Sequence, residues 1–322
     1  MRFAFLMDPL DRVAVDKDTT FALMLSAQGR GHTLYTLGPD DLIAEGPSTF
    51  ARVRRARVQR AEAPGHAAEG PVERLDLATF DAVFVRTDPP FDSRYLYVTQ
   101  LLERIKGRTL VLNDPRGLRD ANEKLYALHF PEVMPRTLVA SSEAEIRAFL
   151  EGLGTSGVIK PLDGAGGRGV MLLDLADRNF RSIVETLTDA GRRYAMVQEY
   201  LPAVRVGDKR ILLLDGEALG AILRVPRDDD ARSNIHVGGS VVPADLDDDD
   251  RRIVAAVGPR LRADGLYFVG LDVIGGRLTE VNVTSPTGIQ ELSRFAGGDP
   301  EGRVIAWVES GAASLRQSAV PA

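Results

Sequence analysis

Residues 271–286 read LDVIGGRLTEVNVTSP, a pair of short apolar strands joined at two glycines. The pair carries three oxygen donors, Asp272, Glu280 and Asn282. Glu280 and Asn282 are two residues apart and therefore share one face of their strand. The register of the hairpin decides whether Asp272 joins them. A two-residue turn would set Asp272 opposite Thr279, on the wrong face, whereas a three-residue loop would set it opposite Glu280.

The donor set of this hairpin is all oxygen, with no histidine or cysteine. Such a set suits Mg²⁺, a hard cation that bridges carboxylates and substrate phosphates. The alternative is an acidic hairpin that faces solvent. Because Asp272 and Glu280 stand in otherwise apolar strands, where an unpaired carboxylate is costly, the pattern favours a metal site.

A glycine-dense stretch lies upstream, at residues 159–169, IKPLDGAGGRG. Gly164, Gly166 and Gly169 satisfy G-x-G-x-x-G, but a strand, VMLLDL, follows where a dinucleotide-binding loop needs a helix. No Gly-Lys-Ser/Thr of a Walker A loop is present. The remaining interpretation is a strand–loop–strand flap whose backbone approaches phosphates, with Lys160 adding positive charge. A flexible hairpin with an ordinary surface lysine is the alternative.

The order of the predicted elements changes near residue 120. Before that point strands alternate with helices, which indicates an open, mostly parallel sheet. The region 52–71 looks like a strand followed by a polar loop, and 117–130 like a helix that leads into the second region. Beyond it short strands come in hairpins, including one around Asp215-Gly216 and one around Gly275-Gly276.

Composition excludes several classes of function. The chain has 322 residues, a net charge of −6 and no cysteine. It therefore has no basic surplus for nucleic acid, no disulfide and no thiolate chemistry. No stretch reaches the length of a membrane span, and the N-terminal apolar run is too short for a signal peptide, so we expect a cytoplasmic protein. Four scattered histidines and the absence of G-x-S-x-G leave zinc sites and hydrolase triads without support.

Other charged and polar residues stand at expected strand ends. The segment 196–202, MVQEYLP, is predicted to be a strand that ends in a bend. In a nucleotide-binding site, backbone groups of such a segment can form hydrogen bonds with adenine. The alternative is a strand that simply leaves the sheet. Arg210 and Arg224 belong to one hairpin and could together bind a substrate carboxylate or an acyl phosphate. The alternative is that both are ordinary exposed charges at strand ends. Ser285 or Thr287 would cap a following helix, and either cap would bring a helix N-terminus next to the metal site. The acidic run 245–252 predicts a helix N-terminus.

Together these motifs resemble the ATP-grasp fold and, more narrowly, the bacterial glutathione synthetase family, over nearly the whole chain to about residue 310. The resemblance rests on the following stretches: MDP (7–9), DPPFD (88–92), LRDANEKL (118–125), KPLDGAGG (160–167), YLPA (200–203), GDKR (207–210), FVGLD (268–272) and LTEVNVTSPTGI (278–289). It implies an α/β protein that is α+β in its C-terminal part. A Rossmann-like pre-ATP-grasp domain (1–120) would precede an ATP-grasp domain (121–316), which has a central lid subdomain (121–200) and a C-terminal subdomain (201–316).

The family implies ligation of γ-glutamylcysteine and glycine to glutathione, with ATP hydrolysed to ADP and phosphate through an acyl phosphate. It also implies Mg²⁺ (or Mn²⁺) and a homotetramer. By position, ATP phosphates would meet Lys124, Lys160, Gly164, Gly166, Gly167 and Gly169, and ATP would also contact Gln198, Glu199, Tyr200, Leu201 and Asp208. Asp272, Glu280 and Asn282 would hold the metal, Arg210 and Arg224 would act in catalysis, and Ser285 and Thr287 would lie near substrate.

The departures from the family pattern are mild. Arg168 adds a charge within the flap, Glu199 stands where a neutral residue is expected, and the 227–239 loop, expected to be a second flap, is rich in aspartate. The main alternative is another ATP-grasp carboxylate–amine ligase, which would use the same lysine and metal apparatus. A nucleotide-binding regulatory protein is a weaker alternative, because such a protein would be expected to lose metal ligands.

Overall fold

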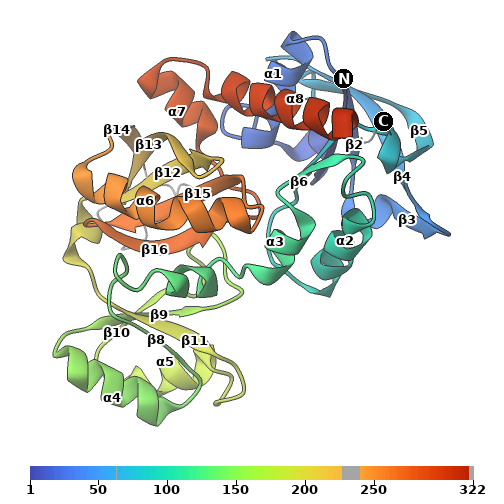
Figure 1. The fold of residues 1–322 in the computed structure, drawn as a ribbon. Helices are drawn as coiled ribbons and strands as arrows, with labels where there is room; N and C mark the ends of the chain where they lie inside the picture. Colours follow the sequence, from blue (N-terminus) through green and yellow to red (C-terminus); the bar gives the residue numbers. More distant parts are fainter. Residues whose placement is uncertain (63, 227–239, 319–322) are drawn as a thin grey trace.

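The computed structural model describes residues 1–62, 64–226 and 240–318, and within these ranges the strands form three sheets. Figure 1 shows the sheets as separate layers: the first lies with both termini, the second with α4 and α5, and the third between them under α6. None of the described helices combines the length and the apolar character that crossing a membrane would require.

The first sheet has seven strands and a parallel centre, as the alternating pattern predicts. Its parallel strands are β1 (Arg2–Met7), β2 (Thr33–Leu37), β6 (Ala82–Arg86) and β7 (Leu110–Leu112). Their near-continuous burial is typical of strands covered on both faces. Its antiparallel strands are β3 (Leu42–Glu45), β4 (Ser48–Val58) and β5 (Ala67–Asp76). The predicted polar loop within 52–71 is therefore wrong in part, because β4 and β5 continue into it as a long hairpin.

Helices from both ends of the chain pack against the first sheet. These are α1 (Thr19–Gly29), α2 (Ser93–Glu103), α3 (Pro115–Asp120) and α8 (Pro300–Ser318). Val304, Ile305 and Val308 of α8 join the same buried cluster as Phe3 and Phe5 of β1. The C-terminal helix thus returns to the N-terminal core, beside α1 (Figure 1).

The second sheet contains the flap. It has four antiparallel strands: β8 (Thr137–Ala140), β9 (Gly157–Pro161), β10 (Met171–Leu173) and β11 (Ala195–Glu199). Two helices, α4 (Glu143–Leu153) and α5 (Phe180–Leu187), cover one face with a small apolar cluster of their own. The predicted pairing of the strands on either side of the glycine loop is confirmed, with Ile159 opposite Met171.

The third sheet has five antiparallel strands in the order β14-β13-β12-β15-β16. They are β12 (Asp208–Leu214), β13 (Glu217–Val225), β14 (Ser240–Ala244), β15 (Phe268–Ile274) and β16 (Arg277–Asn282). Both predicted hairpins are present. On one face lies α6 (Asp248–Ala263), whose N-terminus is closed by a capping box between Asp247 and Asp250, as the acidic run predicts. Alternation along the strands leaves the other face to polar side chains.

The predicted helix over 117–130 is broken in the middle. After α3 ends at Asp120, a separate 3-10 helix spans Leu125–His129. The side chain of Asn122 accepts hydrogen bonds from the backbone nitrogens of Lys124 and Leu125, at 3.1 and 3.0 Å. This local bond competes with the helical pattern, which explains the break.

Gly117 is the point at which α3 meets the turn before β15. A Cβ placed on Gly117 would lie 2.2 Å from the carbonyl oxygen of Asp264, and the backbone nitrogen of Asp114 donates to Gly265 O at 3.0 Å. Backbone therefore touches backbone at this joint, and no flexible side chain is available to move aside.

We predict that Gly117→Ala lowers the free energy of unfolding by about 2 kcal/mol or more, because the backbones must separate. Denaturant unfolding measures this. The matched control is Gly152→Ala in α4, where the nearest atom to the added Cβ is Arg136 Nη2 at 3.8 Å. This control is expected to leave stability unchanged or slightly raised. Equal stability of the two variants would contradict the tight joint.

Candidate active site

One face of the third sheet collects charged and amide side chains, which we call the charged face. Cross-strand pairs build it: Asp208 opposite Arg224, Arg210 opposite Asp272, and Asp272 opposite Glu280. Paired residues on neighbouring strands point to the same side, so the sheet itself brings these groups together. The charged face comprises Asp208, Arg210, Arg224, Asp272, Glu280 and Asn282.

A β-bulge sets the register of the β15–β16 hairpin. The turn has two residues, and Ile274 pairs with Arg277 and Val273 with Leu278. The pairing then shifts by one, so that Asp272 faces Glu280 and Thr279 is the extra residue. The turn is therefore the two-residue alternative. The bulge nevertheless brings the three oxygen donors to one face, where a regular two-residue hairpin would have set Asp272 opposite Thr279. Thr279 also stabilises the bulge, since its hydroxyl donates to Asp272 O at 3.1 Å.

Two arginines hold Asp272. Arg210 Nε and Nη2 lie 2.6 and 3.2 Å from its two carboxylate oxygens, and Arg224 Nη2 lies 2.8 Å from Oδ1. Arg224 also donates to Asp208, so it bridges two carboxylates. Burial by itself would raise the pKa of Asp272, but the charges of Arg210 and Arg224 outweigh it and hold this pKa below its usual range.

Two buried lysines reach the charged face from outside its sheet. Lys160 extends from β9, and its Nζ donates to Thr279 O, at the bulge, over 3.3 Å. Lys124 Nζ lies 3.0 Å from Glu280 Oε1 and 2.5 Å from Gly164 O. Burial lowers the pKa of Lys160, and Glu280 partly opposes that change. Lysine side chains thus link the flap and the carboxylate hairpin.

The glycine loop closes the flap hairpin beside Lys124. Gly166, Gly167 and Gly169 have φ values of 63°, 76° and 74°, which favour glycine. A Cβ on Gly164 would lie 2.8 Å from Pro161 Cγ. The loop is therefore folded tightly on its own strand, and its glycines are required by its shape.

The predicted adenine segment lies at the end of β11. Gln198 is buried and donates to Thr137 Oγ1 at 3.2 Å. The backbone nitrogens of Glu199 and Tyr200 donate to Arg136 O and Ser156 O, at 2.9 and 3.1 Å. Leu201 follows as the residue before a 3-10 helix (Pro202–Arg205).

Neither predicted helix cap after β16 is correct. The helix α7 (Ile289–Ala296) begins later, and its N-cap is Gly288, at a φ of 115°. Ser285 Oγ instead donates to Arg86 O at 3.4 Å, and Thr287 O accepts from Arg210 Nη1 at 3.2 Å. These two residues therefore lie in an irregular segment between the charged face and α7. The expected second flap at 227–239 lies outside the described residues.

Two residues that the sequence analysis did not single out also support this region. Glu123 Oε1 accepts from the backbone nitrogens of Val283 and Thr284, at 2.8 and 3.0 Å. The side-chain amide of Asn113 donates to Phe268 O and Val283 O, at 2.8 and 2.9 Å. Glu123 lies within the LRDANEKL motif (118–125), and the resemblance of that motif to the family is the sequence signal for it.

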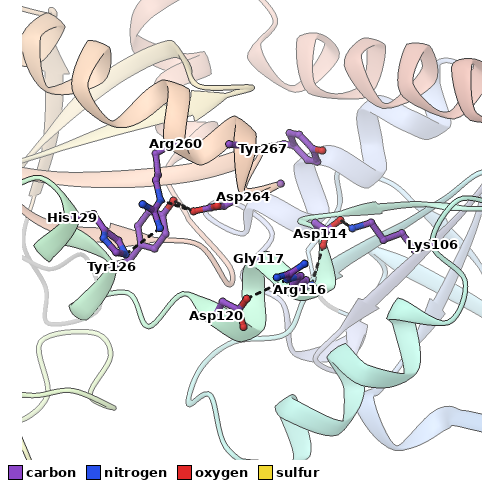
Figure 2. Close-up of a pocket in the computed structure, with 12 residues that line it drawn as sticks. Lys106, Asp114, Arg116, Gly117, Asp120, Tyr126, His129, Arg260, Asp264 and Tyr267 are labelled. Atoms are coloured by element: carbon purple, nitrogen blue, oxygen red, sulfur yellow. Dashed lines mark hydrogen bonds and ion pairs between the residues drawn. The ribbon is translucent and has the colours of Figure 1, made fainter.

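A cleft of about 560 Å³ is lined by residues of α3 and of the C-terminal end of α6, and no residue of the charged face lines it (Figure 2). Its lining residues pair with one another: Tyr126 and Arg260 both bond Asp264, at 2.8 and 2.9 Å, and Lys106 bonds Asp114 at 2.6 Å. None of the predicted site residues lines it. We therefore place the candidate active site at the charged face.

Asp272, Glu280 and Asn282 offer only oxygen donors, which suit a hard metal ion. Two of the three are carboxylates, and the described residues contain no cluster of three or more His, Cys, Asp or Glu that could hold a metal. Glu280 and Asn282 sit side by side on β16, and Asp272 lies opposite Glu280. The Asn282 amide nitrogen donates to Gly270 O at 3.3 Å, which orients the side chain. Carboxylate and amide oxygens of this kind are magnesium ligands.

We predict that Arg224→Met lowers the free energy of unfolding by about 3 kcal/mol, since it removes a buried cation shared by two carboxylates. Denaturant unfolding at neutral pH checks this. Arg252→Met is the matched control, because Arg252 pairs with Asp249 at 3.0 Å on the surface. There the change should stay within about 0.5 kcal/mol. A similarly small effect at Arg224 would contradict the network.

Two family models match this chain: "Prokaryotic glutathione synthetase, N-terminal domain" over residues 1–119 and "Prokaryotic glutathione synthetase, ATP-grasp domain" over residues 123–297. A glutathione synthetase from Synechococcus elongatus is 47% identical over 319 residues, covering 96% of this chain and 98% of the relative. One from Mesorhizobium japonicum is 45% identical over 299 residues, covering 93% and 95%.

Solved structures show the same fold at lower identity. D-cycloserine synthetase DcsG has a TM-score of 0.65 at 19% identity and covers 98% of this chain and 100% of its own. The ATP-grasp ligase PsnB, with a minimal precursor, has a TM-score of 0.65 at 17% identity and covers 96% and 98%. These likenesses establish the ATP-grasp architecture, and the family models and relatives go further: this chain belongs to the prokaryotic glutathione synthetase family.

Proposed function

We propose that the charged face, with Lys124, Lys160 and the glycine loop, is the site at which this ATP-dependent ligase joins γ-glutamylcysteine to glycine. The observation that carries the proposal is the convergence of two lysines and two arginines on a row of oxygen donors. A carboxylate oxygen of the peptide attacks the γ-phosphorus of ATP, and ADP leaves. The amine of glycine then attacks the acyl carbon, phosphate leaves, and the nitrogen loses a proton.

The two lysines suit the phosphates of ATP. Both reacting partners, a carboxylate and a triphosphate, are anionic, so cations must bring them together. Lys160 is buried, and the contact described for its Nζ is a neutral carbonyl, Thr279 O. A phosphate at this point would supply the counter-charge that a buried ammonium needs. Backbone groups of the flap glycines would complete the phosphate cradle.

The two arginines suit the peptide carboxylate and the acyl phosphate. Arg210 is anchored through Asp272 and through Thr287 O. Arg224 is fully buried, and its Nε has no hydrogen-bond partner among the described residues. That free donor supports a role for Arg224 in binding an oxygen of the substrate. Ser285 and Thr287, in the adjoining irregular segment, are proposed to lie near the peptide.

Asp272, Glu280 and Asn282 are the residues proposed to hold Mg²⁺ (or Mn²⁺). When bound, the ion supplies positive charge that neutralises the phosphate oxygens during transfer. Because two arginines already hold Asp272, Glu280 and Asn282 are the donors with more freedom to bind the metal.

We propose several finer assignments. Gln198, Glu199, Tyr200 and Leu201 are assigned to adenine and Asp208 to the nucleotide, from family resemblance. A domain boundary near residue 120 is supported by the two family models, which meet between residues 119 and 123. The subdomains at 121–200 and 201–316 are proposed from the family resemblance. We also propose a homotetramer, from the family resemblance, and a cytoplasmic location, from the sequence features given above.

We predict that the protein releases ADP only when Mg-ATP, γ-glutamylcysteine and glycine are all present, with one glutathione formed per ADP. A coupled ADP assay with each component omitted in turn, together with chromatography of the product, measures this. Turnover with a different peptide or amine in place of either substrate would instead indicate another carboxylate–amine ligase. ATP binding without any turnover would contradict ligase activity.

We predict that Glu280→Gln raises the Mg²⁺ concentration needed for half-maximal activity by about tenfold or more, since a charged ligand is lost. Titration of activity against free Mg²⁺ measures the shift. Glu151→Gln, an exposed position on α4, is the control and should titrate as the unchanged protein does. If both variants have the same Mg²⁺ dependence, Glu280 is not a metal ligand.

A further inference from the structure

The segment 283–287, directly after β16, has no helix or strand of its own. Side chains from distant parts of the chain hold its backbone instead. Asn113 donates to Val283 O at 2.9 Å, Arg86 Nη2 donates to Pro286 O at 2.9 Å, and Arg210 Nη1 donates to Thr287 O at 3.2 Å. An irregular segment without ladder bonds needs such partners, because its buried backbone groups must be satisfied.

Glu123 makes the most extensive of these contacts. Its Oε1 accepts from the Val283 and Thr284 backbone nitrogens, at 2.8 and 3.0 Å, and from the Thr284 hydroxyl at 2.9 Å. Its own carbonyl oxygen accepts from the Val281 nitrogen at 3.0 Å. One residue therefore fixes the end of β16 and the start of the irregular segment together. A carboxylate that accepts several N–H and O–H bonds is a strong, orienting acceptor.

The residues on either side of Glu123 bind the flap. Asn122 Nδ2 donates to Leu162 O at 3.1 Å, and Lys124 Nζ donates to Gly164 O at 2.5 Å and contacts Glu280 at 3.0 Å. The stretch 122–124 thus touches the flap on one side and the carboxylate hairpin with its following segment on the other. Glu123 is the member of this stretch that bonds the segment 283–287.

We propose that Glu123 is a positioning residue that fixes the segment 283–287 and thereby sets how the peptide and glycine bind, without itself touching substrate. This inference rests on the proposed function, which assigns Ser285 and Thr287 to the substrate region. The segment begins one residue after Asn282, so a shift of its backbone would move the substrate contacts relative to the metal ligands. Small displacements of a substrate-binding segment reduce turnover strongly even when the chemical groups remain.

The test compares Glu123→Ala and Glu123→Gln with the unchanged protein in steady-state assays of all three substrates. Glu123→Ala removes the acceptor, and we expect the KM of γ-glutamylcysteine or glycine to rise by about tenfold or more while the KM of ATP stays within about twofold. Glu123→Gln keeps an acceptor oxygen at the same place and should restore most of the loss. A second measurement, the preference for glycine over alanine, should weaken in Glu123→Ala.

Tyr126→Phe is the matched control. Tyr126 lies close to Glu123 in the chain, but it donates to Asp264 at 2.8 Å in the cleft of Figure 2, which no residue of the charged face lines. This variant loses one partly buried hydrogen bond near residues 122–124 and leaves the contacts of the segment 283–287 in place. It should keep wild-type KM values for all three substrates, which separates positioning from general loosening of the chain.

Amide hydrogen exchange of a peptide that spans Val283 and Thr284 gives a readout independent of turnover. It should exchange faster in Glu123→Ala than in the unchanged protein and Tyr126→Phe. Unchanged exchange overturns the contact itself. The positioning role is overturned if exchange is faster but the KM values of γ-glutamylcysteine and glycine are those of the unchanged protein. It is also overturned if the KM of ATP rises as much as theirs. If the unchanged protein makes no glutathione although exchange responds as expected, the proposed function fails and this inference fails with it, while the contact stands.

Discussion

The site depends on one constraint: Asp272 is a buried carboxylate, and it can remain charged only while Arg210 and Arg224 surround it. Taking these three charges out of water is costly, and the cost is offset only if the geometry is good on every side. The sheet supplies that geometry. Arg210 stands opposite Asp272 in the β12–β15 ladder and Arg224 stands opposite Asp208 in the β12–β13 ladder, so strand pairing and ion pairing require the same register.

The rest of the charged face follows from this register. The bulge at Thr279 brings Glu280 opposite Asp272 and leaves the Thr279 carbonyl where Lys160 can donate to it. Lys124 then links Glu280 to the carbonyl of Gly164. The flap is therefore attached to the carboxylate hairpin through two lysines. A phosphate that competed for these ammonium groups would act on the flap and on the hairpin together, which is a physical basis for coupling nucleotide binding to flap position.

The sequence predicted the parts of this structure that carry strong local signals. The alternation of strands and helices predicted the parallel sheet, an Asp-Gly pair and a Gly-Gly pair located the two hairpins, and the acidic run located the start of α6. The sequence did not predict the bulge, because two-residue turns and three-residue loops both fit a glycine pair, and the outcome depends on Thr279 bonding across the strand. It also placed the start of α7 too early, because serine and threonine are the usual caps and here an αL glycine takes that position.

Glu123 and Asn113 were overlooked for a different reason. Their partners are backbone atoms more than 150 positions later in the chain, such as the Val283 nitrogen and oxygen. A backbone group has no residue type, so no motif in the later segment points back to its partner. The charged groups that we assign to the chemistry can be recognised from the sequence because they must be lysine, arginine, aspartate or glutamate. The side chains that hold the segment beside them become visible only once the fold is known, and they satisfy backbone groups that would otherwise be free to move.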